Sequence, residues 1–353
     1  MSITITIDGR VVAASTGDTV QDVAGRLGIE IPTLCHDARL EPTGACRMCL
    51  VEVSDQRRMQ PACAYKVTDG LEVKTGSERV ERHRRNLLSL YLADTPLDVD
   101  GLPAERGPVN DVRSHVGTYG TGPTYTSIRA KREGRDDPNP YIHFDPESCI
   151  SCARCVRYCD EVEAVSAITL AGRGASTTIA TADQVSLLDS TCELCGGCID
   201  TCPTGAMSEK KLVGMAIQAE KQVRTTCNFC GVGCQLDLHV KDDKVVRVSS
   251  PPPGTTLNDG NLCVKGRFSY EFIHHEDRLT TPLIRKDGEL VPATWDDALK
   301  AAAEGLMGVK DRHGADSLGF ISSSRCTGEE NYLVQKLARA AFGTNNCHQC
   351  AAT

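Results

Sequence analysis

The alternation of apolar and polar residues predicts a strand-rich unit at the start of the chain. The stretch ITITIDGRVV alternates on both sides of Asp8-Gly9, a dipeptide typical of a tight β-hairpin turn. A helix is expected over about residues 18–27, closed by Gly28. The stretches CLVEV and GLEVKT predict two further strands. Residues 1–78 are therefore expected to form one domain with several strands and one helix.

Beyond this unit the pattern changes several times. ERVERHRRNLLSLYLAD predicts a helix that stops before Pro96, and residues 95–140, rich in Gly, Pro and charge, predict a linker or a degenerate small domain. LDLHVKDDKVVRV predicts a hairpin. Near the end, a helix with Thr294 as N-cap, a buried strand SLGFISS and a helix closed by Gly343 predict the start of an α/β layer.

Composition indicates what holds these small units together. Aromatic residues are 4% of the chain, whereas cysteines number 19 among 353 residues. The chain shows no secretory signal and no apolar run of membrane-spanning length, so we expect a cytoplasmic protein whose cysteines bind metal. The net charge of −8 argues against a nucleic-acid partner.

Two cysteine runs, CISCARCVRYCD and CELCGGCIDTCP, share the spacing C-x2-C-x2-C-x3-C. This is the spacing of bacterial two-cluster ferredoxins, in which the fourth cysteine of each run binds the cluster of the other run. A pair of zinc sites is the alternative, but zinc needs only four ligands and gains nothing from this register. We expect one 4Fe–4S cluster on Cys149, Cys152, Cys155 and Cys202, and another on Cys192, Cys195, Cys198 and Cys159.

Two further groups of four cysteines leave the metal open on spacing alone. Cys35, Cys46, Cys49 and Cys63 lie on the strand-rich N-terminal unit and suit a 2Fe–2S cluster or one zinc ion. Cys227, Cys230, Cys234 and Cys263 suit a 4Fe–4S cluster or one zinc ion. Cys326, Cys347 and Cys350 remain unassigned by spacing.

Resemblances to known families favour iron–sulfur clusters in both groups. The first resembles a plant-type ferredoxin fold, and its spacing is similar to that of the 2Fe–2S domain of the large electron-input subunit of complex I. The second, with LCVKG at residues 262–266, resembles the cluster domain that opens the molybdenum and tungsten bis-pterin oxidoreductases. That resemblance implies that Lys265 relays electrons between cluster and pterin; without it, Lys265 would be interpreted as a solvated surface residue.

Nearly the whole chain resembles the catalytic subunit of the large cytoplasmic formate dehydrogenases. The tail SRCTGEENYLVQKLARAAFGTNNCHQCAAT carries this resemblance, with Thr344, Asn345 and Asn346 opening the motif and Cys350 as its cysteine. The metal ligand, cysteine or selenocysteine, would then fall at position 354, so no catalytic residue is expected within this chain. We expect that a UGA codon stands at that position and that the chain is the front portion of a selenoenzyme; a frameshift or a true short protein is the alternative.

The sequence departs from the family in two places. Ala352 stands where the motif has arginine. In DTPLDVDGLPAERGPVN, the residues at the positions of an extra cluster with one histidine and three cysteines are Thr95, Val99, Leu102 and Pro108. That cluster therefore cannot form, and the chain is not expected to be an ordinary complex I subunit.

The resemblance implies a multidomain α+β protein. Its expected parts are a β-grasp 2Fe–2S ferredoxin domain, a helix and linker, a two-cluster ferredoxin domain, a β-rich 4Fe–4S domain and the start of an α/β molybdopterin domain, at residues 1–78, 79–140, 141–220, 221–278 and 279–353. No nicotinamide-binding fingerprint is visible. The full-length protein would oxidise formate to CO2 at molybdenum or tungsten held by two pterin guanine dinucleotides.

The resemblance also implies a route for the electrons. They would pass from the cluster of Cys227 to Cys263 through the two ferredoxin-type clusters to the 2Fe–2S cluster. The acceptor would be a flavin-bearing diaphorase-type subunit that reduces NAD, a ferredoxin or a hydrogenase. Two alternatives remain: an electron-input subunit of a complex I-like or hydrogenase assembly, and a standalone iron–sulfur carrier.

Overall fold

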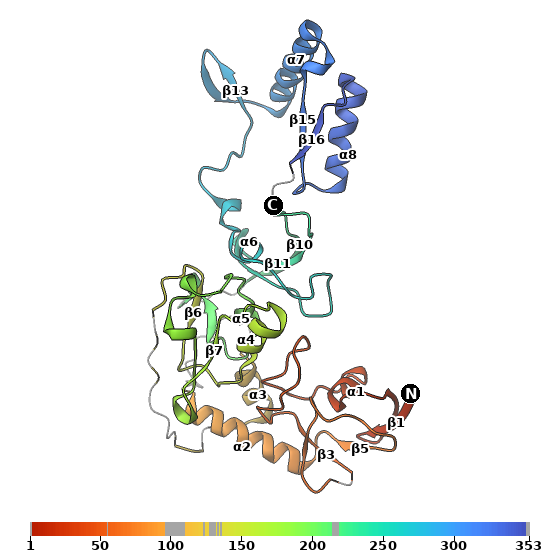
Figure 1. Ribbon diagram of the computed structural model, residues 1–353, viewed down its shortest axis with the longest axis vertical. Coiled ribbons are helices and arrows are strands. Elements are labelled where there is room, and N and C mark those ends of the chain that lie inside the picture. The colour runs from red at the N-terminus through yellow and green to blue at the C-terminus, as the bar shows by residue number, and fades with distance from the viewer. Residues whose placement is uncertain are drawn as a thin grey trace. The chain divides into compact units, whose positions relative to one another are not determined.

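The computed structural model divides the chain into two compact units, residues 1–218 and 219–353, and each is described by itself (Figure 1). The structure describes the whole chain except residues 1, 55, 96–109, 123, 127–131, 133, 135, 214–218 and 351–353. No helix in the described part of the chain combines the length and apolar character needed to cross a membrane.

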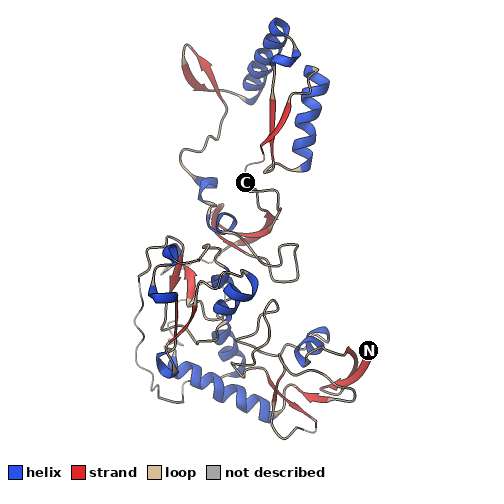
Figure 2. Ribbon diagram, viewed as in Figure 1, coloured by secondary structure: helices blue, strands red, loops and turns tan. Residues whose placement is uncertain are grey.

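The first unit opens with a five-stranded mixed sheet in the order β2-β1-β5-β3-β4. Strand β1 pairs antiparallel with β2 and parallel with β5, the arrangement of a β-grasp domain. Figure 2 shows these strands close to the N-terminus, with helix α1 beside them. The elements are β1 (Ser2–Ile7), β2 (Arg10–Ser15), α1 (Val20–Arg26), β3 (Leu50–Val53), β4 (Gln60–Pro61) and β5 (Glu72–Lys74).

Local sequence explains the first elements. The hairpin turns at Asp8-Gly9 with both residues at positive φ, 48° and 81°, as the dipeptide predicted. Helix α1 begins after Thr19, which forms a capping box with Asp22. Inward-facing Ile5 and Ile7 of β1 pack with Val20 and Val23 of α1 in a small apolar core. The predicted hairpin, helix and strands of this domain are confirmed.

Two helices cover the loop that carries the first cysteines. Helix α2 (Glu78–Asp94) follows its predicted boundaries and begins after Ser77, whose hydroxyl accepts from Val80 N. Helix α3 (Asp111–Tyr119) lies within the stretch predicted to be a linker, and the sequence pattern did not predict it. Its buried Val112 and Val116 belong to the same cluster as Leu88 and Leu92 of α2 and the cysteines Cys35 and Cys46. The helix has only nine residues, one of them Gly117, and Val112 and Val116 are its only buried residues, so its apolar periodicity is too short to recognise in the sequence.

The remainder of the first unit is built around the two long cysteine runs. Helices α4 (Arg154–Arg157) and α5 (Gly197–Asp200) each occupy the same place in their run, directly around its third cysteine. A π-helical turn, Tyr158–Val162, extends α4. Two small antiparallel sheets accompany them, formed by β6 (Ile142–Phe144) with β9 (Met207–Glu209), and by β7 (Thr169–Ala171) with β8 (Thr178–Ala180).

A buried charged network joins the β-grasp domain to this ferredoxin-like part. Asp37 is paired with Arg39 at 2.8 Å, accepts a hydrogen bond from Thr201 at 2.9 Å and lies 3.6 Å from Arg154. Arg154 also lies 3.4 Å from Asp111 of α3. Burial alone would raise the pKa of Asp37, but the hydrogen bonds from Arg39 and Thr201 hold it below the usual aspartate range. Asp37 is therefore ionised, and it links segments 164 residues apart.

The second unit begins with a three-stranded antiparallel sheet and a short helix. Lys221–Thr226 (β10), Gln235–Lys241 (β11) and Lys244–Ser249 (β12) form the sheet, and α6 spans Val264–Phe268. The predicted hairpin is β11–β12, whereas β10 is an exposed edge strand that was not predicted. Leu236, Val248, Leu262 and Tyr270 form the core, against which Cys227 and Cys234 pack.

The end of the chain forms the predicted helix–strand–helix series and one more strand. Helix α7 begins after Thr294, whose hydroxyl accepts from Asp297 N, and the turn that extends α8 ends at Gly343 with φ 76°. Strand β15 pairs in parallel with β16, which was not predicted. The elements are β13 (Leu283–Lys286), β14 (Glu289–Pro292), α7 (Trp295–His313), β15 (Phe320–Ser323), α8 (Gly328–Lys336), the π-helical turn (Leu337–Phe342) and β16 (Cys347–Cys350).

One expectation about this region is wrong. SLGFISS was expected to be a buried strand, but although Leu318 is buried, Ile321 within the strand is 74% exposed. Trp295 on α7 and Tyr332 on α8 are also largely exposed, at 68% and 63%. The two-stranded β15–β16 sheet has one partner for each strand and too few neighbours to cover its faces.

We predict that Asp37→Ala destabilises the first unit far more than loss of a surface ion pair does. The substitution leaves Arg39 and Arg154 buried without their shared partner, which should cost roughly 3–5 kcal/mol in the free energy of unfolding. Glu81→Ala is the matched control, because Glu81 pairs with Arg85 at 3.5 Å on an exposed face of α2 and should cost about 0.5 kcal/mol or less. Denaturant unfolding under anaerobic conditions measures both, and equal costs would contradict a structural role for the network.

We also predict that Gly197→Ala prevents correct packing of the ferredoxin-like part. A Cβ at Gly197 would lie 1.9 Å from Cε1 of Tyr158, a ring that is 1% exposed and stacked under Arg39. Overpacking of this kind costs about 1–3 kcal/mol or more. Gly117→Ala in α3 is the control, because no atom lies within 4 Å of its Cβ position. Thermal unfolding should separate the two variants clearly, and similar midpoints would show that the Tyr158 ring moves freely.

Candidate iron–sulfur sites

The first group of cysteines lies on the loops between α1 and β5. Cys49 and Cys63 bring their sulfur atoms to 3.4 Å, and the amide of Cys46 donates to the sulfur of Cys35 at 3.3 Å. All four side chains, including Cys35 and Cys46, are at most 5% exposed. Cys63 lies within electrostatic reach of both Cys35 and Cys46, so the four thiols share one site.

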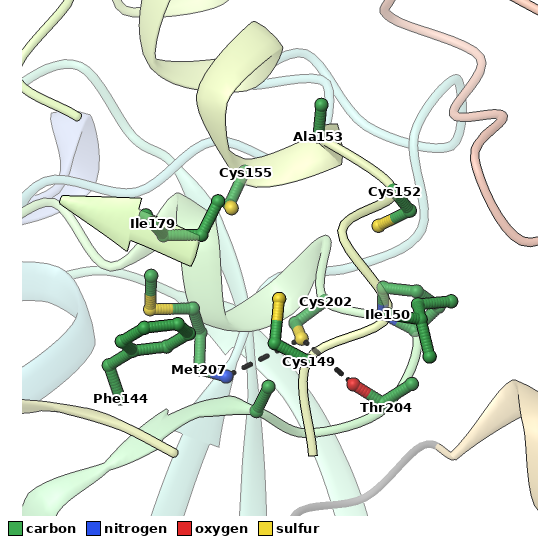
Figure 3. Close-up of a pocket in the computed structure, with 12 residues that line it drawn as sticks. Phe144, Cys149, Ile150, Cys152, Ala153, Cys155, Ile179, Cys202, Thr204 and Met207 are labelled. Carbon is green, nitrogen blue, oxygen red and sulfur yellow. Dashed lines mark hydrogen bonds between the residues drawn. The ribbon is translucent and has the colours of Figure 1, made fainter. Parts of the chain in front are cut away.

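The second group lines an apolar pocket in the ferredoxin-like part. Figure 3 shows Cys149, Cys152 and Cys155 from the first run around this pocket together with Cys202 from the second run. Phe144 and Ile179 form part of the wall. The pocket thus gathers three cysteines of one run and the last cysteine of the other.

The third group is the reverse of the second: its expected ligands are three cysteines of the second run and one cysteine of the first. Cys192 and Cys159 lie within electrostatic reach of each other, although they belong to different runs. The amide of Ala167 donates to the sulfur of Cys159 at 3.2 Å, and that of Gly197 to the sulfur of Cys195 at 3.5 Å. Cys195 and Cys198 flank the start of α5. The arrangement is consistent with one site that takes three cysteines from the second run and Cys159 from the first.

The two runs also share a local backbone conformation. The residues two and four places after the first cysteine have positive φ in both: Ser151 (53°) and Ala153 (60°), and Leu194 (54°) and Gly196 (74°). This curl brings the amides of Ser151 and Leu194 to 3.4 Å from the sulfur of the preceding Cys149 and Cys192. Non-glycine residues at positive φ cost about 1–3 kcal/mol each and persist where surrounding structure enforces them, which is common at functional sites.

The fourth group lies in the second unit. Cys234 is within electrostatic reach of Cys227, Cys230 and Cys263, and the amide of Cys227 donates to the carbonyl of Cys234 at 2.8 Å. A Cβ at Gly266 would lie 3.6 Å from the sulfur of Cys227, an ordinary van der Waals contact, so this part of α6 lies next to the site. Lys265, expected to relay electrons, lies beside Gly266 with an exposed side chain.

The chemistry of these groups fits iron–sulfur clusters. The donors are sulfur atoms only, in apolar surroundings, with amide hydrogens directed at several of them. Burial raises the pKa of Cys152 to about 12 and also raises the pKa of Cys155 well above the usual thiol value, so these thiols hold their protons until a metal displaces them. In the first group the hydrogen bond from Cys46 outweighs burial and lowers the pKa of Cys35 to about 5. Among the described residues, no set of three or more His, Cys, Asp or Glu is gathered to hold a single metal ion.

The last described residues are held in place by the first part of the tail motif. Thr344 is 3% exposed, and its hydroxyl donates to Asp316 at 3.2 Å. Asn346 donates to the carbonyls of Asp316 and Leu318, and its own carbonyl accepts from Phe320 N at 2.8 Å. These contacts set the register in which β16 pairs with β15, so the carboxyl ends of both strands lie together.

A glycine of the fourth cysteine group lies beside this edge. A Cβ at Gly231, between Cys230 and Cys234, would be 3.2 Å from the carbonyl oxygen of Ser324, which follows β15. Open α/β sheets bind ligands at the carboxyl ends of their parallel strands. The sequence spacing did not reveal this proximity, because it links segments about a hundred residues apart.

Some sequence expectations concern residues at the edges of the described ranges. Thr95, one of the residues at a missing-cluster position, is 1% exposed and closes α2 through a hydrogen bond to the carbonyl of Tyr91. Val99, Leu102, Pro108 and Ala352 lie outside the described residues. Cys326 is exposed, and Cys347 is partly buried in β16.

Four families match consecutive parts of the chain. Residues 1–78 match the 2Fe-2S iron-sulfur cluster binding domain, and residues 139–208 match the ferredoxin-like domain of NADH-quinone oxidoreductase subunit 3. Residues 220–275 match the molybdopterin oxidoreductase Fe4S4 domain, and residues 278–353 match molybdopterin oxidoreductase. These matches confirm the predicted fold class: ferredoxin-like domains of both kinds followed by the start of a molybdopterin oxidoreductase domain.

Several proteins are similar over almost the entire chain. The NADPH-Fe(3+) oxidoreductase subunit alpha of Geobacter sulfurreducens is 38% identical, over 98% of this chain and 40% of its own length. A subunit of an NADH-quinone oxidoreductase of Rhizobium meliloti is 36% identical with the same coverage, and a Bacillus subtilis protein named "Putative formate dehydrogenase YrhE" is 28% identical, over 99% and 40%.

Among solved structures, a chain of an NAD+-reducing [NiFe]-hydrogenase in the H2-reduced state matches with a TM-score of 0.55 and 28% identity, over 63% of this chain and 92% of its own. The chain spans about two fifths of the length of the curated relatives it matches. The chain thus carries N-terminal iron–sulfur domains followed by the start of a molybdopterin oxidoreductase domain, and it is similar over nearly its whole length to the front part of larger oxidoreductase subunits.

Proposed function

We propose that this chain conducts single electrons between a pterin-bound metal in the rest of the protein and a redox partner. The observation that carries the proposal is the gathering of sixteen cysteines into four sulfur-lined groups on matching family domains. When bound, iron–sulfur clusters would supply one-electron steps at potentials set by burial and by hydrogen bonds to sulfur. The chain's own residues supply those hydrogen bonds and exclude water.

The proposed ligands follow the groups described above. Cys35, Cys46, Cys49 and Cys63 would hold a 2Fe–2S cluster, and the other three groups a 4Fe–4S cluster each. The apolar pocket shared by Cys149 and Cys202 supports exchange of the fourth ligand between the two runs. Lys265 would lie between the cluster of Cys227 and the pterin. Its side chain is exposed, so it is accessible to a pterin held by the rest of the protein.

We further propose formate as the electron donor of the full-length protein, with molybdenum or tungsten as the metal. The tail motif supports this, because Thr344 and Asn346 hold β16 so that its carboxyl end lies beside β15. Gly231 places the fourth cysteine group against the same edge, the position an electron exit from the metal would need.

A second candidate is an electron-input subunit of an NAD(P)H-linked or hydrogenase-linked assembly, without formate chemistry. The observation in its favour is that the relatives named for NADPH and NADH oxidation are 38% and 36% identical, against 28% for the one named for formate. In either case a flavin-bearing subunit, a ferredoxin or a hydrogenase would exchange electrons with the chain, and a cytoplasmic location would give access to these partners.

Single Cys→Ser variants should reveal the proposed exchange of ligands. Cys152→Ser and Cys202→Ser should perturb the same 4Fe–4S signal, because both line one pocket. Cys195→Ser and Cys159→Ser should perturb the other. Low-temperature EPR of the anaerobically purified, reduced protein measures each signal, and acid-labile sulfide gives the total cluster content.

Cys326→Ser is the control, because this exposed cysteine belongs to no group and its loss should leave all signals unchanged. If Cys202→Ser removed the signal of Cys195 instead, each run would hold its own cluster, contrary to the proposal.

Formate should reduce the iron–sulfur chromophore of the full-length protein translated from the native gene. We expect bleaching of visible absorbance on formate addition, with none in a protein ending at Thr353, and a codon for cysteine or selenocysteine at position 354. NADPH and H2, each with and without partner subunits, are the comparison donors. Reduction by these donors but not by formate would favour the electron-input candidate.

A further inference from the structure

One arginine joins the loop of the first cysteine group to the ferredoxin-like part. Arg157 donates from Nη1 to the carbonyl of Glu41 at 2.6 Å and from Nη2 to the carbonyl of Cys35. On the same side, the amide of Glu41 donates to Glu161 at 2.8 Å. The loop that begins at Cys35 is therefore fixed to α4 and the turn after it by a cation and a carboxylate.

The position of Arg157 in the chain is as informative as its contacts. It lies two residues after Cys155 and two before Cys159, which belong to the two different 4Fe–4S groups. One hydrogen bond thus connects this segment to the backbone of a cysteine in the 2Fe–2S group. Cys35 and Arg157 are 122 residues apart in sequence, so only the folded structure brings them together.

The guanidinium is suited to act on the redox properties of the adjacent site. Arginine keeps its positive charge in proteins, and its planar fork can bind two carbonyls at once. The Nε of Arg157 is buried and has no hydrogen-bond partner among the described residues. Because reduction adds one negative charge to a cluster, a fixed cation nearby favours the reduced state, and a partly buried cation is poorly screened.

We propose that Arg157 is a positioning residue that holds the Cys35 loop against α4 and raises the reduction potential of the 2Fe–2S cluster. This inference rests on the cluster assignment proposed above. If both clusters are bound, the step they would supply is the transfer of one electron from a reduced 4Fe–4S cluster, which would be oxidised, to the 2Fe–2S cluster, which would be reduced. No proton is transferred, since the guanidinium remains charged throughout.

A second arginine offers a matched control at another site. Arg132 donates from Nη2 to the carbonyl of Cys149 at 2.7 Å and from Nη1 to the carbonyl of Thr177 at 2.8 Å. Like Arg157, it binds the backbone of a cysteine through a guanidinium whose Nε is buried without a partner among the described residues. Each arginine therefore donates a hydrogen bond to the backbone of a ligand of a different proposed cluster.

The test is an EPR-monitored redox titration of the holoprotein with dithionite as reductant. In Arg157→Gln the ratio of reduced to oxidised 2Fe–2S cluster at a fixed potential should fall about tenfold, a shift of about 59 mV to more negative potential. Arg157→Lys keeps the charge but loses the fork, so its potential should remain closer to wild type. Arg132→Gln should shift the cluster of Cys149 and leave the 2Fe–2S potential unchanged.

The outcomes separate this inference from the function on which it rests. A wild-type protein without a 2Fe–2S signal would overturn the proposed function itself. A fully assembled Arg157→Gln protein with an unchanged 2Fe–2S potential would overturn the role of Arg157. If Arg157→Gln fails to assemble the cluster, Arg157→Lys decides: a 2Fe–2S potential lowered by the full shift of about 59 mV would show that the cation is not responsible.

Discussion

Hydrogen bonds from backbone amides to cysteine sulfur are the constraint on which the first unit depends. The curled backbone after Cys149 and after Cys192 places an amide 3.4 Å from each sulfur, and three of the four residues at positive φ in these turns are not glycine. With aromatic residues at 4% of the chain, large apolar cores are scarce, and a cluster of buried apolar residues surrounds Cys35 and Cys46. The amide–sulfur hydrogen bonds and the packing of apolar residues around the cysteines therefore stabilise the same loops.

Local signals in the sequence predicted several of the longer regular elements. Asp8-Gly9 makes its hairpin, and Thr294 begins its helix, because turn and cap preferences act within a few residues. Helix α3 was missed because Val112 and Val116 gain their burial from α2, a partner that periodicity cannot reveal. The strand at Ile321 was expected to be buried because an apolar run does not show whether neighbours will cover it.

The cysteine spacing predicted which loops could bind clusters and that the two long runs would exchange their fourth ligands. It did not predict the contacts that join the first cysteine group to the ferredoxin-like part. The contacts of Asp37 with Thr201 and of Arg157 with Cys35 cross more than a hundred residues, and nothing in either local stretch marks them. The residues that connect one cysteine site to another are therefore arginines and an aspartate. In the sequence alone, they cannot be distinguished from ordinary charged surface residues.

The pocket shared by Cys149 and Cys202 has a consequence for biosynthesis. Its lining is complete only after Met207 has been synthesised, 58 residues after its first cysteine, Cys149, whereas the first group closes at Cys63. A ribosome therefore exposes the thiols of the first run before the structure that shelters them exists. During that interval these thiols depend on a reducing environment and on timely iron delivery, so the order of synthesis sets the order in which the sites can mature.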